Sequence, residues 1–181
     1  MESQSTHEIH IIRLACLCAA VCVAMLYVTA SHAAGAPASD LGPGEPEFSA
    51  MGQSAAITQA GSNQWASIDQ GGQRNSANVT QSLANNVAAI TQSGTRNALN
   101  LTQYGYGNQA SSSQQGSNNS VSASQAGNSN AISATQNGSS NSAGVQQVGS
   151  HDTVQLTQTG SNHAVSVQQY GSGMHAIVYQ H

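Results

Sequence analysis

The chain has little of what an ordinary soluble domain relies on. Aromatic residues make up 4% and charged residues 6% of its 181 residues, whereas charged residues are about 25% of a typical domain. Lysine is absent, and from residue 54 onward the formal charges are only Asp69, Arg74, Arg96 and Asp152, which sum to zero. There is therefore no basic patch for a nucleic acid to bind. The low charge also argues against conventional disorder, which usually accompanies high net charge.

Cysteine is confined to residues 16–22, inside a segment with the pattern of a secretory signal peptide. An apolar run covers residues 14–28, and small residues follow it, which predicts a signal peptide over residues 1–33 with cleavage after Ala33 or Ala34. The run is shorter than the roughly 20 residues of a membrane span. We expect the mature chain to have no transmembrane span, no disulfide and no thiol chemistry.

Proline is confined to residues 34–53, between the signal peptide and the rest of the chain. This segment also holds three acidic residues, Asp40, Glu45 and Glu47, and shows no strand pattern. It is predicted to be a flexible, disordered leader. Because proline would interrupt a strand ladder, its absence from residues 54–181 fits continuous strands.

Residues 54–181 contain a repeat in which glutamine recurs every eleven residues without a slip. An unbroken period indicates a stacked repeat architecture. The glutamine column consists of Gln59, Gln70, Gln81, Gln92, Gln103, Gln114, Gln125, Gln136, Gln147, Gln158, Gln169 and Gln180. Two positions later lies a glycine column, broken only by Leu83, with Gly61, Gly72, Gly94, Gly105, Gly116, Gly127, Gly138, Gly149, Gly160 and Gly171. Five positions after glutamine lies an asparagine column of Asn75, Asn86, Asn97, Asn108, Asn119, Asn130 and Asn141, whose other members are Gln64, Asp152, His163 and Met174.

Within each repeat, inward and outward residues alternate. The positions four and two before each glutamine are apolar, except for Ser112. Asparagine, the two apolar residues and glutamine therefore share one face of an extended strand, while the positions between them are mostly Ser, Thr or Asn. About four residues from glutamine to asparagine are predicted to form the link, where glycine supplies a positive φ. Each repeat is thus one strand and one turn.

Such strands bury their apolar face only by stacking. If successive strands face each other across a thin core, two repeats close one coil of 22 residues, and the array predicts a β-solenoid of about six two-strand coils that rises about 4.8 Å per layer. Identical amides would then hydrogen-bond along the stack, as in amyloid. Three residues depart from the columns and predict weak repeats, Leu83, Ser112 and Asp152, and we expect such weak repeats to slow spontaneous assembly during export.

The repeat resembles curlin, the subunit of bacterial curli fibres, over about residues 50–181. The family spacing Ser-x5-Gln-x-Gly-x-x-Asn-x-Ala-x3-Gln is matched by Ser54, Gln59, Gly61, a shifted Asn63, Ala66 and Gln70, and again by Gln92, Gly94, Asn97 and Gln103, with Leu99 in the alanine position. The frequent Gln-Tyr-Gly of the family is similar to Gln103-Tyr104-Gly105 and Gln169-Tyr170-Gly171.

The resemblance implies a secreted functional amyloid. It implies export with periplasmic factors, passage through an outer-membrane secretion pore that recognises the leader at residues 34–53, and self-assembly into extracellular fibres on the bacterial surface. The glutamine, asparagine and glycine columns would form the self-assembly ladder, and the partners would be further copies of the chain and a companion curlin subunit. The fibres of the family serve cell adhesion and biofilm formation.

Two roles within the family stay open. The nucleator subunit of the family has a divergent, basic last repeat, whereas here Gln180 is in register and no basic residue follows Arg96 except histidine. This favours the major subunit. The near-uniform asparagine column and the repeat Ala66-Ser67-Ile68-Asp69-Gln70 resemble the nucleator.

Other functions find less support in the sequence. An ice-binding solenoid would need flat double ranks of threonine, and the outward column of Thr58, Thr80, Thr91, Thr102, Thr135 and Thr157 is interrupted by other residues. A calcium-binding β-roll needs an aspartate in every turn. The two carboxylates of the repeats lie far apart in sequence and give no catalytic pair. His151, His163, His175 and His181 are out of phase with the period; we expect no metal site, no cofactor and no enzyme activity.

Overall fold

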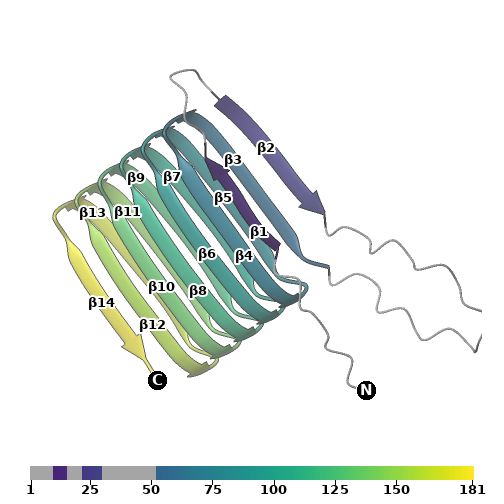
Figure 1. Cartoon of the computed structure of the whole chain (residues 1–181). Helices are drawn as coiled ribbons and strands as arrows, with labels where there is room; N and C mark the ends of the chain where they lie inside the picture. The colour runs from purple at the N-terminus through teal and green to yellow at the C-terminus, as the bar shows by residue number, and fades with distance from the viewer. Residues whose placement is uncertain (1–9, 16–21, 30–51) are drawn as a thin grey trace, which may run out of the picture.

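The computed structural model describes residues 10–15, 22–29 and 52–181, and every element in them is a strand (Figure 1). The strands of the repeat region have nine residues each, apart from the shorter last one. They are β1 (His10–Ala15), β2 (Cys22–Thr29), β3 (Ser54–Ser62), β4 (Trp65–Gln73), β5 (Ser76–Ala84), β6 (Val87–Thr95), β7 (Ala98–Tyr106), β8 (Gln109–Ser117), β9 (Ser120–Asn128), β10 (Ala131–Ser139), β11 (Ser142–Ser150), β12 (Thr153–Ser161), β13 (Ala164–Ser172) and β14 (His175–Gln180).

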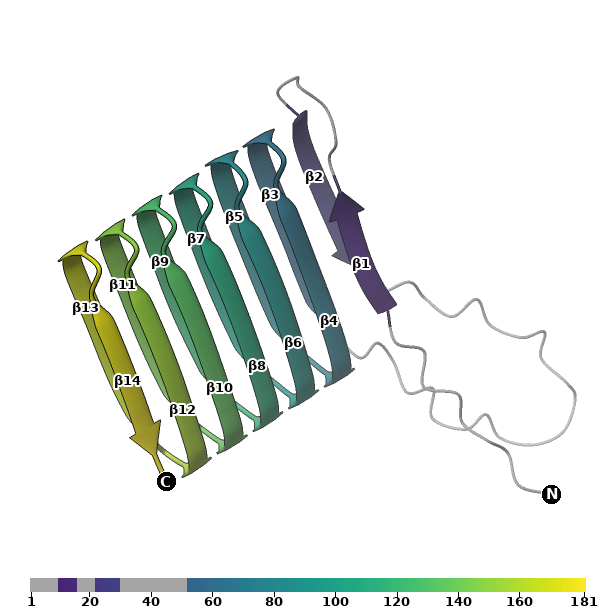
Figure 2. The same ribbon diagram turned by 60° about the vertical axis from the view of Figure 1, so that its left-hand side comes forward.

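The strands form two sheets that face each other. The first sheet has the order β1-β4-β6-β8-β10-β12-β14, and the second has the order β13-β11-β9-β7-β5-β3-β2. From β3 to β14 the chain alternates between the sheets, and neighbours within a sheet are parallel, with each residue paired to the one 22 positions later, as Gln59 is to Gln81 (Figure 2). The predicted all-β solenoid of about six two-strand coils is confirmed.

The core is a thin apolar layer between the two sheets. Along each strand buried and exposed residues alternate, as the repeat predicts, so β7 reads exposed, buried, exposed, buried over its whole length. The buried apolar residues come from the two predicted columns, with alanine, valine, isoleucine or leucine at each level. Ser112 takes such a position, and its buried Oγ has no hydrogen-bond partner among the described residues. A polar atom without a partner is costly there, so Ser112 makes β8 a weak point of the core.

The links between strands are shorter than the sequence suggests. Between β5 and β6 only Asn85 and Asn86 lie outside the strands, instead of the four residues expected after Gln81. The glycine and the residue after it continue the strand ladder, as in the pairing of Gly94 with Gly116. Each link is then tied to the link of a neighbouring coil, for example by the Asn85 N–H, which donates to the Ser62 carbonyl at 3.1 Å. The expectation of a four-residue turn is wrong because glycine bends the strand without leaving the sheet.

The glycine column is required by close contact between coils. Its glycines have φ between 102° and 151°, a region that other residues rarely adopt. A Cβ atom built on Gly127 would lie 1.8 Å from the Gly149 carbonyl oxygen of the next coil. The column therefore allows adjacent layers to approach to strand-pairing distance at the bend. Leu83 occupies the same column with φ 79°, so its backbone is strained.

Strands β1 and β2 lie beside the first coil and differ from all others in direction. β1 pairs antiparallel with β4, and β2 pairs antiparallel with β3. Both fall within residues 1–33, where the sequence predicts a signal peptide, so its removal would leave β3 and β4 as edge strands. The cleavage position at Ala33 or Ala34 and the leader up to residue 51 lie outside the described residues. Among the residues that the structure describes, no helix is long and apolar enough to cross a membrane.

Candidate functional site

The predicted glutamine column forms two continuous ladders, one in each sheet. In both, the Nε2 of one glutamine donates to the Oε1 of the glutamine one coil further along the chain, at 2.6 to 2.9 Å. The second sheet carries Gln59, Gln81, Gln103, Gln125, Gln147 and Gln169, and the first sheet carries Gln70, Gln92, Gln114, Gln136, Gln158 and Gln180. The side chains from Gln59 to Gln169 are buried and Gln180 is half-buried, so within the stack the amides satisfy one another where water has no access.

Each glutamine of the column from Gln70 to Gln180 also links the two sheets. The Nε2 of Gln81 donates to the backbone carbonyl of Trp65 at 3.1 Å, and the Nε2 of Gln125 donates to that of Gln109 at 3.0 Å. The bond crosses the core from one sheet to the other. One amide therefore fixes both the spacing of the coils and the closure of each coil. This double role explains why glutamine occupies this position in every repeat.

The asparagine column closes the links at both ends of the strands. Asn97 shows the pattern: its Nδ2 donates to the carbonyls of Ser93 and Gly116, both at 3.1 Å, and its Oδ1 accepts a hydrogen bond from the Asn119 N–H at 3.1 Å. The described asparagines of this column are buried. The Nδ2 and Oδ1 atoms thus form hydrogen bonds with backbone carbonyl and N–H groups that have no strand partner at the turn. The asparagine ladder thus holds the turn and the next coil together.

The exceptions in the asparagine column leave bonds unmade. Gln64 is buried, and its Oε1 has no partner among the described residues. Asp152 is fully buried: its Oδ1 accepts from the Met174 N–H at 2.9 Å, but its Oδ2 has no partner in the described part of the chain. In most asparagines of this column, the Nδ2 atom occupies the place of this Oδ2 and donates to two backbone carbonyls. An ionised carboxylate has no hydrogen to donate. His163 and Met174 complete the exceptions and lie in the last coil.

The two ends of the glutamine ladders are incomplete in opposite ways. At the first coil, the buried Oε1 of Gln59 has no donor in the part of the chain that is described. At the last coil, the Oε1 atoms of Gln169 and Gln180 still accept from the preceding coil, but their Nε2 atoms donate only across the core, to the carbonyls of Thr153 at 3.2 Å and Ala164 at 3.3 Å. One end therefore presents an amide acceptor and the other presents amide donors.

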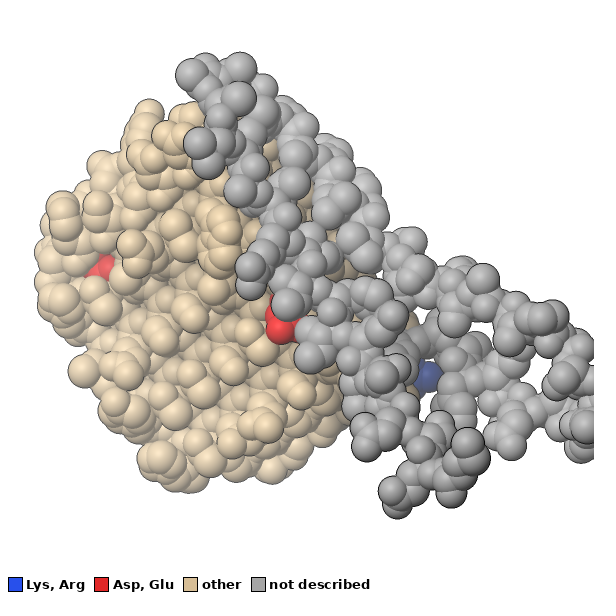
Figure 3. All heavy atoms as spheres, viewed as in Figure 1, with Lys and Arg blue, Asp and Glu red and all other residues tan. Residues whose placement is uncertain are grey.

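On the face of the molecule shown in Figure 3, the described residues carry few charged side chains. The outward threonines of the sequence do not share one face: Thr58, Thr80 and Thr102 lie on the second sheet. The others, Thr91, Thr135 and Thr157, lie on the first sheet, where Ser113 separates Thr91 from Thr135. Neither face has the double rank of threonine that an ice-binding surface requires. In the described residues no group of three His, Cys, Asp or Glu side chains could hold a metal ion.

The turns contain a second conformational signal that the sequence reading does not identify. The residue just before the asparagine column has φ between 53° and 69° at every link described. This position holds Asn63, Arg74, Asn85, Arg96, Gly107, Asn118, Ser129, Ser140, His151, Asn162 and Gly173. Asparagine and glycine tolerate this left-handed region, and their frequency here is the signal that would have located the turn.

Comparison with known proteins agrees with the repeat architecture. The chain matches the family of the curlin associated repeat at residues 54–82, 94–127 and 127–160, more than half of its length. No curated protein matches it. The matched residues contain strands of both sheets and rungs of all the amide ladders. The chain belongs to the curlin family.

Proposed function

We propose that the chain is a secreted structural subunit, with no enzyme activity, that polymerises into curli-like extracellular fibres for cell adhesion and biofilm formation. The observation that carries the proposal is the complementarity of the two ends. The last coil offers the donors of Gln169 and Gln180. The first coil begins the same two columns with Gln70 and with Gln59, whose buried Oε1 has no donor among the described residues. A second copy placed on the stack would extend each ladder without a change of register.

Unpaired strand edges support the same proposal. In the order of the sheets, β13 and β14 have a neighbour on one side only. Soluble proteins usually block such edges with charged residues, proline or a bulge. β14 contains no proline and no Asp, Glu, Lys or Arg. The first coil gains free edges when residues 1–33 are removed, because β1 and β2 lie within that segment. Signal removal, passage through an outer-membrane pore and recognition of the leader at residues 34–53 belong to this proposal.

The major fibre subunit is the first candidate role, because the last repeat keeps Gln180 in its ladder. The second candidate is the nucleator, a companion that templates polymerisation at the outer membrane. It is favoured by the near-uniform asparagine column, whose ladder bonds are formed in most coils. A major subunit and a nucleator differ in whether a partner is needed to form long fibres.

The experiment that tests the proposal follows residues 34–181 at tens of micromolar by thioflavin T fluorescence and fibre diffraction. The apolar core and all the ladders lie within residues 52–181, so this part contains the contacts that close the coils. We expect unaided fibres with reflections near about 4.7 and 10 Å. A chain that remains monomeric for days would contradict the proposed function.

A matched pair of variants tests the ladders in the same assay. Gln59→Leu combined with Gln180→Leu removes one amide from each ladder at the joint between copies and leaves its partner unpaired, at a cost of about 1 to 3 kcal/mol per group. We expect slower growth and poor seeding by wild-type fibres. Gln114→Leu, an interior change, should affect elongation less because Gln114 does not meet the next copy. Faster growth of the terminal variant would show that apolar burial, and not the ladder, drives assembly.

A further inference from the structure

The outer face of the first sheet has two columns whose end residues differ from all residues between them. One column runs Trp65, Val87, Gln109, Ala131, Thr153 and His175. The other runs Asp69, Thr91, Ser113, Thr135, Thr157 and Tyr179. The interior members are neutral and not aromatic. Within these two columns, aromatic and ionisable side chains occur only in the first and the last coil.

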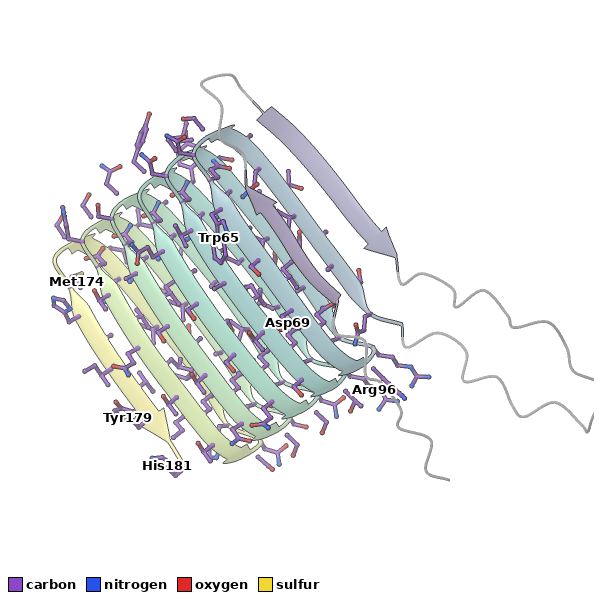
Figure 4. All side chains as sticks on the ribbon, in the orientation of Figure 1. Trp65, Asp69, Arg96, Met174, Tyr179 and His181 are labelled. Carbon is purple, nitrogen blue, oxygen red and sulfur yellow. The ribbon has the colours of Figure 1, made fainter. Side chains whose placement is uncertain are left out.

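These end residues lie far apart within one molecule. Trp65 and Asp69 lie on β4, while Tyr179 lies on β14 at the opposite end of the stack (Figure 4). His175 begins β14, and Tyr179 is 58% exposed. The residues at one end of these columns therefore do not contact those at the other end within one molecule.

A second copy would bring them together. Within the molecule the register advances by 22 residues per coil, so that Thr153 pairs with His175 and Thr157 pairs with Tyr179. If a further copy continues this register, its Trp65 follows His175 and its Asp69 follows Tyr179, one layer or about 4.8 Å away. The glutamine ladders fix this register, because Gln180 meets Gln70 of the next copy in the same strand pair.

We propose that these two pairs form a self-recognition contact at the joint between copies, in which His175 stacks on Trp65 and the Tyr179 hydroxyl donates to the Asp69 carboxylate of the next copy. The inference rests on the proposed function, since in both a second copy of this chain binds to the open strand edges. An imidazole packs favourably on an indole face, more strongly when it is protonated. A hydrogen bond to a carboxylate is about twice as strong as a neutral one.

The second sheet provides a contrast at the same joint. Its columns would place Ala164 next to Ser54 and Ser166 next to Ala56 of the next copy, since these columns begin with Ser54 and Ala56. Small side chains of this kind allow the sheets to stack but distinguish few partners. The contact that distinguishes a copy of this chain from another repeat protein is therefore on the first sheet.

The contact is compatible with the chain only after its N-terminal segment is removed. In the full chain β1 pairs with β4, with Ala15 opposite Trp65 and Ile11 opposite Asp69. β1 thus occupies the edge that the next copy would need. Residues 34–181 lack β1 and are the appropriate form for a test, since the core and the ladders lie within them.

Trp65 is the single tryptophan of the chain and reports on the joint directly. Wild-type residues 34–181 are added to wild-type seeds, and indole emission is followed with thioflavin T fluorescence. We expect the emission of Trp65 to be quenched as fibres grow, and His175→Gln to abolish the quenching. His151→Asn, which changes an exposed histidine at an interior turn, should quench like the wild type.

The second pair is tested by elongation rate on wild-type seeds. Tyr179→Phe should slow growth about tenfold, the change that corresponds to loss of a hydrogen bond to a charged group at an interface. Tyr104→Phe is the control, because Tyr104 is also 58% exposed but lies in an interior coil. Asp69→Ala should be slow by itself and add little to Tyr179→Phe, since both remove the same bond.

The possible outcomes distinguish failure of the inferred contact from failure of the proposed function. Wild-type fibres with unchanged Trp65 emission, together with equal growth of the two Tyr→Phe variants, would overturn the contact and leave fibre formation standing. Additive effects of Asp69→Ala and Tyr179→Phe would overturn the second pair. Failure of the wild type to form fibres would overturn both the function and the contact.

Discussion

The interior coils and the last coil share a backbone but differ in how completely their side chains are bonded. In the interior, Gln125 accepts from Gln103 at 2.8 Å and donates both to Gln147 at 2.9 Å and to the Gln109 carbonyl. In the last coil, Gln169 lacks the bond to a further glutamine.

Burial of the apolar residues follows the same difference. Val121 and Val145 of interior strands are 2% and 4% exposed, whereas Val165 and Val167, which occupy the same two columns in β13, are only partly buried. The comparison shows that one coil is completed by the coil after it, and that a free last coil is a binding surface with the composition of a protein interior.

The largest expected effect comes from placing a methyl group in the glycine column. In Gly127→Ala the new Cβ would lie 1.8 Å from the Gly149 carbonyl oxygen, at φ 123°, so the two coils must separate. We expect a loss of about 3 to 5 kcal/mol of unfolding free energy, measured by urea unfolding of the freshly prepared soluble chain.

Gly171→Ala makes the same change in the last coil, where the nearest atom is Met174 Sδ at 3.5 Å. Only the backbone strain remains there, about 1 to 2 kcal/mol. Its elongation should nevertheless fall sharply, because the first coil of the next copy carries Gly61 in this column. Equal destabilisation by the two variants would show that the coils are not held at this bend.

A smaller effect, of opposite sign, is expected where the asparagine ladder is interrupted. Asp152→Asn replaces the buried Oδ2 that has no partner with a nitrogen that can donate to the carbonyls of Val148 and Gly171, as Asn130 does to Ala126 and Gly149. We expect a gain of about 2 kcal/mol in unfolding free energy and a shorter lag before fibres appear.

The reverse change supplies the control. Asn130→Asp, one coil earlier in the same ladder, should lower the unfolding free energy by a similar amount and lengthen the lag. If Asp152→Asn leaves both quantities unchanged, then the carboxylate is not a weak rung, and it would not slow assembly during export.

Most of the fold follows from two periods in the sequence. The two-residue alternation places Val79 and Gln81 on one strand face, and the eleven-residue period gives the number of coils, because a repeating chain has few ways to bury one face per repeat. The hydrogen bonding of the glutamine column can also be predicted from the sequence, since buried amides stacked in one column must bond to one another. These expectations depend on local pattern and stacking alone.

Other features could not be read from the sequence. The bond from Gln81 to the Trp65 carbonyl joins two sheets, and its existence depends on how far apart the sheets pack. The predicted turn is too long because glycine does not end the strand: Gly94 stays paired with Gly116. The pairing of the end residues becomes visible only when the eleven-residue column is divided between the two sheets, which separates Thr58 from Thr91.

The smallest effect concerns Leu83, the one residue of the glycine column that is not glycine. Its φ of 79° is unfavourable for any residue with a Cβ atom by about 1 to 2 kcal/mol. Leu83→Gly and Leu83→Ala both remove the half-buried side chain, so their difference isolates the backbone term. We expect the glycine variant to be more stable than the alanine variant by about 1 kcal/mol in urea unfolding.

The order is the reverse of that in an ordinary strand, where glycine is less stable than alanine by about 0.5 to 1 kcal/mol. Ser82, the preceding residue of β5, has no positive φ and provides the matched position, at which alanine should equal or exceed glycine. If alanine is also the more stable residue at position 83, then the backbone there relaxes out of the positive-φ region. Close contact at the bend would then be a property of the interior coils, and the first coils would tolerate a looser stack.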